Sequence, residues 1–314
     1  MFLRPIEEVI AYHVGRIRAW GNPDNAFLAL SGGADSALVA ALLVEAFGKD
    51  RVVTMFRNIR SKIEHKEDAR EVAGVLGVRF LNMDGNFAYD DILRQAKSEM
   101  ERNGDTFYDE GSEEAKNRPN FQGGFESCKS RLTTPMAGLF SKFYMARIYG
   151  TGNIEEDLII RYFDKFGDGA VDYCPIVGLT KMEVWQMLLY FAEKYNAEVF
   201  RRIAYKTPSA DLQANGDVHN DESQLTSLAK AQGFDIQLSY GTPEKEGNLA
   251  WACKEEVRNR SVTVIDNALE YGAYSEKEIQ LLKFMASEEC KTRHKDFGLP
   301  GITRQELMKA GLVD

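Results

Sequence analysis

The sequence predicts an α/β fold, a doubly wound parallel sheet with helices on both faces. Three observations support this. A strand, a glycine loop and a helix follow one another near the start of the chain. Two further apolar runs of strand length come next, with a helical stretch between them, and repeated β-α units of this spacing are typical of a parallel sheet. The chain has 314 residues, of which 44% are hydrophobic, enough for a full core.

The first β-α unit contains the most informative local pattern. Residues 26–30 form a short apolar run, which predicts a strand. Residues 31–33, Ser-Gly-Gly, follow it directly, and the apolar residues of 37–43 predict a helix. The glycines therefore lie between the end of a strand and the start of a helix.

The next units continue the pattern. Residues 52–56 predict a second strand and 78–83 a third. Between them, 67–76 predict a helix that ends at Gly77, since glycine commonly terminates helices.

We expect one domain over residues 1–314. Residues 103–122 are rich in Gly, Asp, Glu, Asn and Pro, which indicates a surface loop or insertion and not a domain boundary. A helical C-terminal part is expected over about 222–314.

Later segments give local signals. Residues 140–149 lead into Gly-Thr-Gly-Asn at 150–153, which is typical of a turn at a strand end. Residues 180–183 have the spacing of a capping box and predict the start of a helix, and 275–278 do the same.

Charge and composition limit the possible functions. The formal net charge of −9 argues against a nucleic-acid partner, because binding a phosphate backbone usually needs a basic face. No apolar run approaches the roughly 20 residues of a membrane span, and the N-terminus becomes polar too early for a signal peptide. The four cysteines are scattered without a Cys-x-x-Cys pair, so neither zinc nor disulfides are expected. A cytoplasmic enzyme is the expectation.

The glycine loop has the chemistry of an anion site. It reads Ser31-Gly32-Gly33-Ala34-Asp35-Ser36. Glycines allow close approach of a ligand, and the N–H groups at a helix start bind anions. It is not a Walker A loop, because no Gly-Lys-Ser/Thr follows. It also lacks the Gly-x-Gly-x-x-Gly pattern, which argues against dinucleotide binding of the Rossmann kind. The alternative is a plain turn.

Further motifs follow in a fixed order along the chain. By themselves they indicate a turn, an acidic patch and a glycine-rich loop with one lysine. They are Gly-Thr-Gly-Asn at 150–153 with acids at 155–157, Phe-Asp-Lys-Phe-Gly-Asp-Gly at 163–169, Leu-Thr-Lys at 179–181, Pro-Ser-Ala-Asp-Leu at 208–212, Asp-Glu at 221–222 and His-Lys at 294–295.

The glycine loop resembles the pyrophosphatase loop of the ATP-pyrophosphatase superfamily, and the ordered set resembles the NAD synthetases from about residue 26 to 295. The resemblance implies an adenine nucleotide alpha-hydrolase-like fold. It implies a carbon–nitrogen ligase that activates deamido-NAD as an acyl-adenylate with ATP and lets ammonia displace AMP. It also implies Mg²⁺ and a homodimer.

The resemblance carries roles to matching positions. Asp35 and Lys181 are the catalytic residues that it implies, and Asp35 and Glu156 the metal-binding carboxylates. The ATP-binding residues that it implies are Ser31, Gly32, Gly33, Asp35, Ser36, Met55, Thr151, Lys181 and Ser209. Those for the second substrate are Arg131, Lys165, Asp172, His294 and Lys295.

Two of these assignments involve a choice. Glu155 and Asp157 flank Glu156, which we select for its distance from Gly150-Thr151. Lys181 stands in the first turn of its helix, where the helix dipole disfavours a cation by up to ~1 kcal/mol. A bound polyphosphate would offset that cost, and a solvated lysine is the alternative.

Departures from the family pattern fall near the acid substrate or in loops, and the one at Phe56 falls in the adenine-side loop. Phe56 follows Met55 where the family commonly has proline, and Thr133 stands where a second arginine is usual after Arg131. Asp296 follows His-Lys where an arginine is common, and residues 213–220 differ from the usual segment before the Asp-Glu pair. Alternative functions are therefore an amide ligase for another carboxylic acid, a tRNA-modifying enzyme of the superfamily, or a nucleotide-binding protein without activity. We expect free ammonia, or a separate partner, to supply the nitrogen, because a glutaminase domain would add several hundred residues.

Overall fold

The computed structural model describes residues 1–160, 166–209, 221–259, 274–286 and 300–314. Within them, four parallel strands form one sheet in the order β3-β2-β1-β4. The strands are β1 Asn25–Ala29, β2 Val52–Asn58, β3 Arg79–Asp84 and β4 Ala146–Tyr149. The chain adds β2 and β3 on one side of β1 and then returns to add β4 on the other side. The strand order therefore reverses beside β1.

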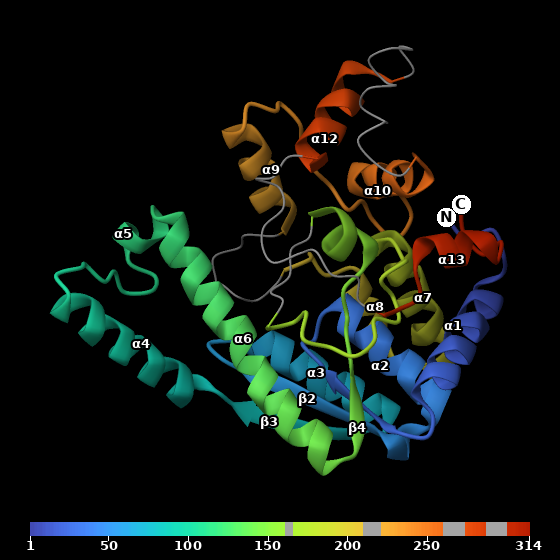
Figure 1. Ribbon diagram of the computed structural model, residues 1–314. Coiled ribbons are helices and arrows are strands. Elements are labelled where there is room, and N and C mark those ends of the chain that lie inside the picture. Colours follow the sequence, from blue (N-terminus) through green and yellow to red (C-terminus); the bar gives the residue numbers. More distant parts are fainter. Residues whose placement is uncertain (161–165, 210–220, 260–273, 287–299) are drawn as a thin grey trace.

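Helices cover both faces of this sheet, as predicted (Figure 1). Side chains alternate between the faces of a strand. Phe27 of β1 packs with Val53, Met55 and Ala137, the last of which belongs to α6 (Pro119–Phe143). The neighbouring β1 residues belong instead to the larger core that contains α2 (Ala34–Phe47). The predicted doubly wound architecture is confirmed.

The larger core lies between the sheet and a layer of helices. Helix α2 contacts α1 (Ile6–Gly21), α3 (Ile63–Leu76), α7 (Lys181–Tyr195) and α8 (Glu198–Ala204). It is apolar around most of its circumference because it is buried among these elements. A short 3₁₀ turn, Lys49–Arg51, joins it to β2.

The polar insertion is only partly a loop. After α4 (Asn86–Arg102), the irregular segment ends at α5 (Glu113–Lys116), whose first turn is capped by the Ser112 hydroxyl. Helix α6 then begins at Pro119, a residue suited to the first helical position. The expectation of a loop as far as residue 122 was therefore wrong for its last part, because local capping residues start two helices there.

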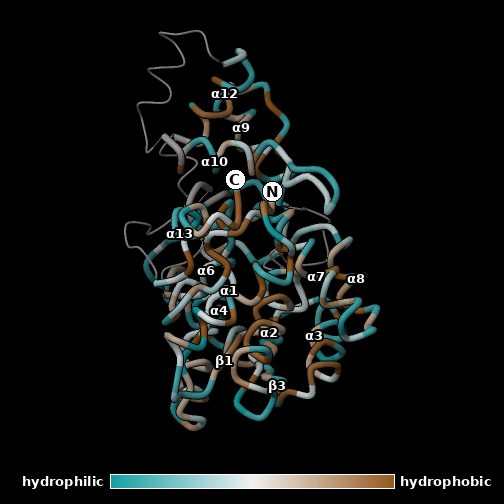
Figure 2. The backbone as a smooth tube through the Cα atoms, turned by 90° about the vertical axis from the view of Figure 1, so that its right-hand side faces the viewer, coloured by the Kyte–Doolittle hydropathy of each residue, from teal (hydrophilic) through white to brown (hydrophobic). Residues whose placement is uncertain are grey.

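After α8, the described residues form the helices α9 (Asp221–Ala231), α10 (Asn248–Asn259), α12 (Glu276–Ala286) and α13 (Arg304–Lys309). Figure 2 shows α9, α10 and α12 at the end of the molecule opposite to β1 and β3. Ser275 and Glu278 form the predicted cap at the start of α12. Among the residues described, no helix is long and apolar enough to cross a membrane.

Candidate active site

A pocket lies where β1, β2 and β4 end. Its cavity measures about 270 Å³, and its lining includes Ser31 after β1, Phe56 near the end of β2 and Thr151 after β4. Ligands in open α/β sheets bind outside the carboxyl ends of the strands, at the point where strand order reverses. This pocket is at that point, beside β1.

The glycine loop forms one wall of the pocket. The Ser36 hydroxyl accepts the Ser31 N–H at 3.2 Å and donates to the Gly33 carbonyl at 3.1 Å, so the loop is held to the first turn of α2. Gly32 has φ +81°, and a Cβ there would lie 2.2 Å from the His65 carbonyl oxygen. Only glycine fits this position, which explains the close approach of the loop to α3.

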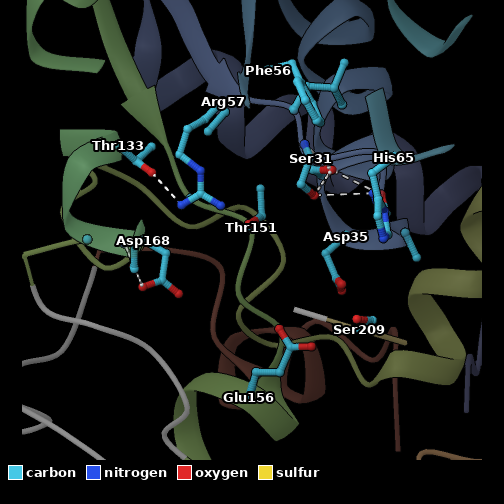
Figure 3. A pocket seen from close by; sticks show the side chains of 18 of the residues that line it. Ser31, Asp35, Phe56, Arg57, His65, Thr133, Thr151, Glu156, Asp168 and Ser209 are labelled. Carbon is cyan, nitrogen blue, oxygen red and sulfur yellow. Dashed lines mark hydrogen bonds between the residues drawn. The ribbon is translucent and has the colours of Figure 1, made fainter. Parts of the chain in front are cut away.

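A cluster of charged side chains lies beside the glycine loop, around a buried lysine. The Lys181 ammonium donates to Asp35 Oδ2 at 2.6 Å and to Glu156 Oε1 at 2.7 Å. Its side chain is 4% exposed. Asp35 comes from α2, Lys181 from α7, and Glu156 from a π-helical turn, Glu155–Ile160. Figure 3 shows Asp35 and Glu156 extending into the same part of the pocket.

The electrostatics of the cluster keep the lysine charged. Burial alone would lower the pKa of Lys181, but the carboxylates of Asp35 and Glu156 raise it above its usual range. Burial and the nearby Asp35 raise the pKa of Glu156, and the Lys181 ammonium opposes that rise. The cluster thus holds one cation between two acidic groups at the end of the glycine loop.

The three adjacent acids have different surroundings. Asn153 donates to Asp35 Oδ1 at 3.0 Å and accepts the Glu156 N–H at 3.1 Å, which directs Glu156 toward Asp35. Glu155 instead accepts the backbone N–H of Lys181, and burial raises its pKa to about 8. The Asp157 carboxylate packs against Gly152.

Helix α7 presents Lys181 from a well-fixed first turn. The Thr180 hydroxyl accepts the Glu183 N–H at 3.4 Å, and the Glu183 carboxylate accepts the Thr180 N–H at 3.0 Å, so the predicted capping box is confirmed. Glu183 also pairs with the buried Arg304 of α13. Two carboxylates offset the cost of an ammonium at this helix start, and the alternative of a solvated Lys181 was wrong.

The structure brings most of the proposed ATP residues to this pocket. Those that line it are Ser31, Gly33, Asp35, Ser36, Met55, Thr151, Lys181 and Ser209, and the proposed metal ligand Glu156 lines it as well. Gly32 does not line the cavity and lies against the His65 carbonyl instead.

The second-substrate residues are placed differently. Arg131 is exposed on α6, and Asp172 is exposed with its carboxylate accepting the Ile148 N–H at 2.8 Å. Neither lines the cavity. Lys165, His294 and Lys295 lie outside the described residues. Their substrate roles stay predictions.

Several lining residues were not predicted. Arg57 directly follows the predicted second strand, and Lys206 lies two positions before the Pro-Ser-Ala-Asp-Leu motif. The Lys206 ammonium lies 3.2 Å from His65 Nδ1 and donates to Asp68 at 2.8 Å. Proximity to recognised motifs could have indicated Arg57 and Lys206, whereas nothing in the sequence indicated His65.

Comparison with known proteins agrees with this architecture. The family model for NAD synthase matches residues 9–230. The NH(3)-dependent NAD(+) synthetase of Archaeoglobus fulgidus is 33% identical over 213 residues, which cover 67% of this chain and 74% of that protein. The corresponding protein of Pyrococcus horikoshii is 31% identical over 219 residues, which cover 69% of this chain and 71% of that protein.

A solved structure shows the same fold. The structure of NMN synthetase from Francisella tularensis matches with a TM-score of 0.61 at 20% identity, and the match covers 94% of this chain and 100% of that one. At this identity the likeness establishes the fold alone.

Proposed function

The chain belongs to the NAD synthase family, and from that premise we propose that it converts deamido-NAD to NAD with ATP and ammonia, releasing AMP and pyrophosphate. The observation that supports this most is the cluster of Asp35, Glu156 and Lys181 beside the glycine loop. It combines an anion-binding loop, one cation and two carboxylates in one pocket. A carbon–nitrogen ligase that cleaves ATP between the α and β phosphates needs these groups.

The donor set fits magnesium. Two carboxylates converge on the single Lys181 ammonium, so their oxygens can surround one small cation. Within the described ranges no group of three or more His, Cys, Asp and Glu side chains forms a complete metal cage. Magnesium is commonly held by one or two carboxylates together with substrate phosphates and water. We propose that Asp35 and Glu156 hold it, where it would neutralise charge on the triphosphate.

The residues of the chain itself perform two tasks. Ser31, Gly33 and Ser36 surround the start of α2, where backbone N–H groups bind the leaving pyrophosphate. An ammonium has three donors, and two of those of Lys181 go to Asp35 and Glu156, so it can also donate to a phosphate oxygen. This stabilises the charge that develops as the substrate carboxylate attacks the α-phosphorus.

Ammonia then attacks the carbonyl of the acyl-adenylate, the bond from that carbonyl carbon to the AMP oxygen breaks, and the nitrogen releases one proton as AMP leaves. A neutral NH₃ molecule carries its own lone pair, so the attack itself needs no histidine base. Positioning of the reactants supplies much of the rate enhancement. We further propose a cytoplasmic homodimer, and sedimentation of the purified protein tests the assembly.

The test is incubation with ATP, Mg²⁺, ¹⁵N-ammonium and deamido-NAD, followed by mass spectrometry. The expected product is NAD with one ¹⁵N atom. A parallel reaction with nicotinic acid mononucleotide distinguishes an amide ligase for another acid. Formation of labelled amide from the mononucleotide alone would refute deamido-NAD as the substrate, and absence of AMP with either acid would refute ligase activity.

A further inference from the structure

We propose that Glu155 is a positioning residue, which fixes where the Lys181 ammonium stands relative to the Glu156 carboxylate by holding the backbone of Lys181. The inference rests on the proposed function and deepens it, since it concerns how the metal-binding turn and the phosphate-binding lysine are kept in register. Glu155 is not among the described residues that line the cavity, so it acts through its neighbours.

One hydrogen bond joins the two elements that carry the charge cluster. Glu155 Oε2 accepts the backbone N–H of Lys181 at 2.8 Å, and both residues are buried. Glu155 belongs to the π-helical turn that also presents Glu156, and Lys181 is the first residue of α7. The bond therefore ties the backbone of the lysine to the residue beside the proposed metal ligand.

The segment that contains Glu155 contacts every member of the cluster. The Asn153 side chain donates to Asp35 and accepts the Glu156 N–H, while Glu155 accepts from Lys181. Asn153 thus orients the two carboxylates, and Glu155 places the ammonium between them. Residues 153–156 act together as a frame for the three charged groups.

A neighbouring backbone bond shows what Glu155 adds. The Ile154 N–H donates to the Leu179 carbonyl at 3.0 Å, so the turn stays attached to the segment before α7 without Glu155. That bond ends two residues before Lys181, whereas the Glu155 carboxyl group reaches the first helical residue itself. Loss of the Glu155 acceptor should therefore loosen Lys181 and leave the local fold in place.

The burial of Glu155 is costly for the fold. Its side chain is fully buried, and among the described residues its Oε1 atom has no hydrogen-bond partner. A buried polar atom without a partner lowers stability, and the single bond from the Lys181 N–H offsets only part of that cost. Proteins accept such local costs mainly at functional sites, where the geometry of a neighbouring group matters more than stability.

The position of Lys181 affects both carboxylates. Its ammonium lies 2.6 Å from Asp35 Oδ2 and 2.7 Å from Glu156 Oε1, so a shift of the lysine changes the surroundings of both oxygens. Removal of a group that orients metal ligands without touching the metal typically costs about tenfold to a hundredfold in metal affinity or activity. We expect a loss of this size when Glu155 no longer holds Lys181.

The test compares three variants with wild type. Glu155→Met removes the acceptor and keeps a side chain of similar length, whereas Glu155→Gln keeps an amide oxygen that can accept the Lys181 N–H. Ser112→Ala is the matched control, because Ser112 Oγ also accepts a backbone N–H at a helix start, that of Ala115 at 3.1 Å. Figure 1 shows its helix, α5, on the left of the molecule and α7 on the right.

The first readout is kinetic, with ATP, the acid and Mg²⁺ varied separately at saturating ammonium. Glu155→Met is expected to lower kcat and to raise the apparent activation constant for Mg²⁺, with a combined effect of about tenfold to a hundredfold. KM for the acid should stay within about twofold of wild type, since the cluster does not hold the acid. Glu155→Gln should restore most of the loss, and Ser112→Ala should match wild type.

The second readout needs neither metal nor turnover. Acetic anhydride acetylates lysines that become accessible, and the Lys181 side chain is 4% exposed and ion-paired. We expect Lys181 to be acetylated several-fold faster in Glu155→Met than in wild type, as measured by mass spectrometry of its peptide. Lys129 is the internal reference, because its side chain is 0% exposed and pairs with Glu110, and its rate should not change.

Three results would overturn the inference. The first is unchanged kinetics with unchanged Lys181 acetylation in Glu155→Met. The second is an equal rise of Lys181 and Lys129 acetylation, which would mean that Glu155 stabilises the whole fold and positions nothing in particular. The third is activity as low in Glu155→Gln as in Glu155→Met, because the glutamine retains the acceptor.

The two proposals fail in different ways. Wild-type protein that makes no amide from deamido-NAD refutes the proposed function, while the acetylation of Lys181 still tests Glu155. Amide formation by wild type together with an unaffected Glu155→Met variant refutes the role of Glu155 alone.

Discussion

At the residue scale, the central feature is a lysine buried between two acids. The sequence motifs predicted that Asp35, Glu156 and Lys181 belong to one site, although 146 positions separate Asp35 from Lys181. The motifs alone give no physical reason why Glu156, among three adjacent acids, faces Asp35. That orientation depends on the π-helical turn and on the hydrogen bonds of Asn153. The sequence did not predict Arg57 as a pocket residue, because the direction of its side chain depends on how α6 packs against the sheet.

The two carboxylates give the first prediction. Asp35→Asn and Glu156→Gln preserve the shape of each side chain but remove a charge next to Lys181, so each should lower AMP formation at least a hundredfold. The melting temperature should remain near that of wild type, since each variant leaves the Lys181 ammonium paired with the other carboxylate. AMP release in the presence of ATP, Mg²⁺, ammonium and acid is the measurement.

Asp157→Asn is the matched control for these variants. Its carboxylate packs against Gly152, whereas the Lys181 ammonium donates to Asp35 and Glu156. Activity that is lost in Asp157→Asn but retained in Glu156→Gln would show that the metal assignment is shifted by one residue.

At the element scale, the sequence located the first three strands to within two residues, because each is a compact apolar run beside a glycine or a turn. It placed the start of α3 four residues late, since Lys62 at that end provides no side-chain cap. The beginning of α6 was also missed. Its first residues are polar, and the sequence resembles a continuing loop although Pro119 starts a helix.

The start of α7 gives a prediction about stability. Arg304 and Glu183 are nearly fully buried and pair at the first turn that presents Lys181. Removing one member of a buried ion pair costs about 3–5 kcal/mol when the remaining charge has no other partner. The Met1 ammonium lies 3.1 Å from Glu183 and offsets part of that cost. Arg304→Met should therefore lower the free energy of unfolding by less than about 3–5 kcal/mol, as measured by urea denaturation.

A second substitution separates the charge effect from packing. In the double variant Arg304→Met, Glu183→Gln, the buried charge is gone while an amide oxygen can still accept the Thr180 N–H. Most of the lost stability should return. A double variant as unstable as Arg304→Met alone would mean that packing of the arginine, and not its charge, stabilises this helix start.

At the scale of the whole molecule, the order of the strands explains why distant motifs form one site. Because β4 joins the sheet beside β1, the turn after β4 meets the glycine loop after β1, and α7 brings Lys181 to the same end. The sequence predicted this architecture from its β-α repeats. It could not place Arg57 opposite the glycine loop, because that requires the packing of α6 on the sheet.

The central claim is that the carboxylate of the second substrate attacks the α-phosphorus of ATP in this pocket. The most direct measurement uses deamido-NAD with ¹⁸O in both carboxylate oxygens, together with ATP, Mg²⁺ and ammonium, and determines by mass spectrometry where the label goes. The predicted result is one ¹⁸O atom in AMP for each NAD formed, with pyrophosphate unlabelled. Label in inorganic phosphate with ADP as the other product, or NAD formation without label in AMP, would contradict adenylation at this site.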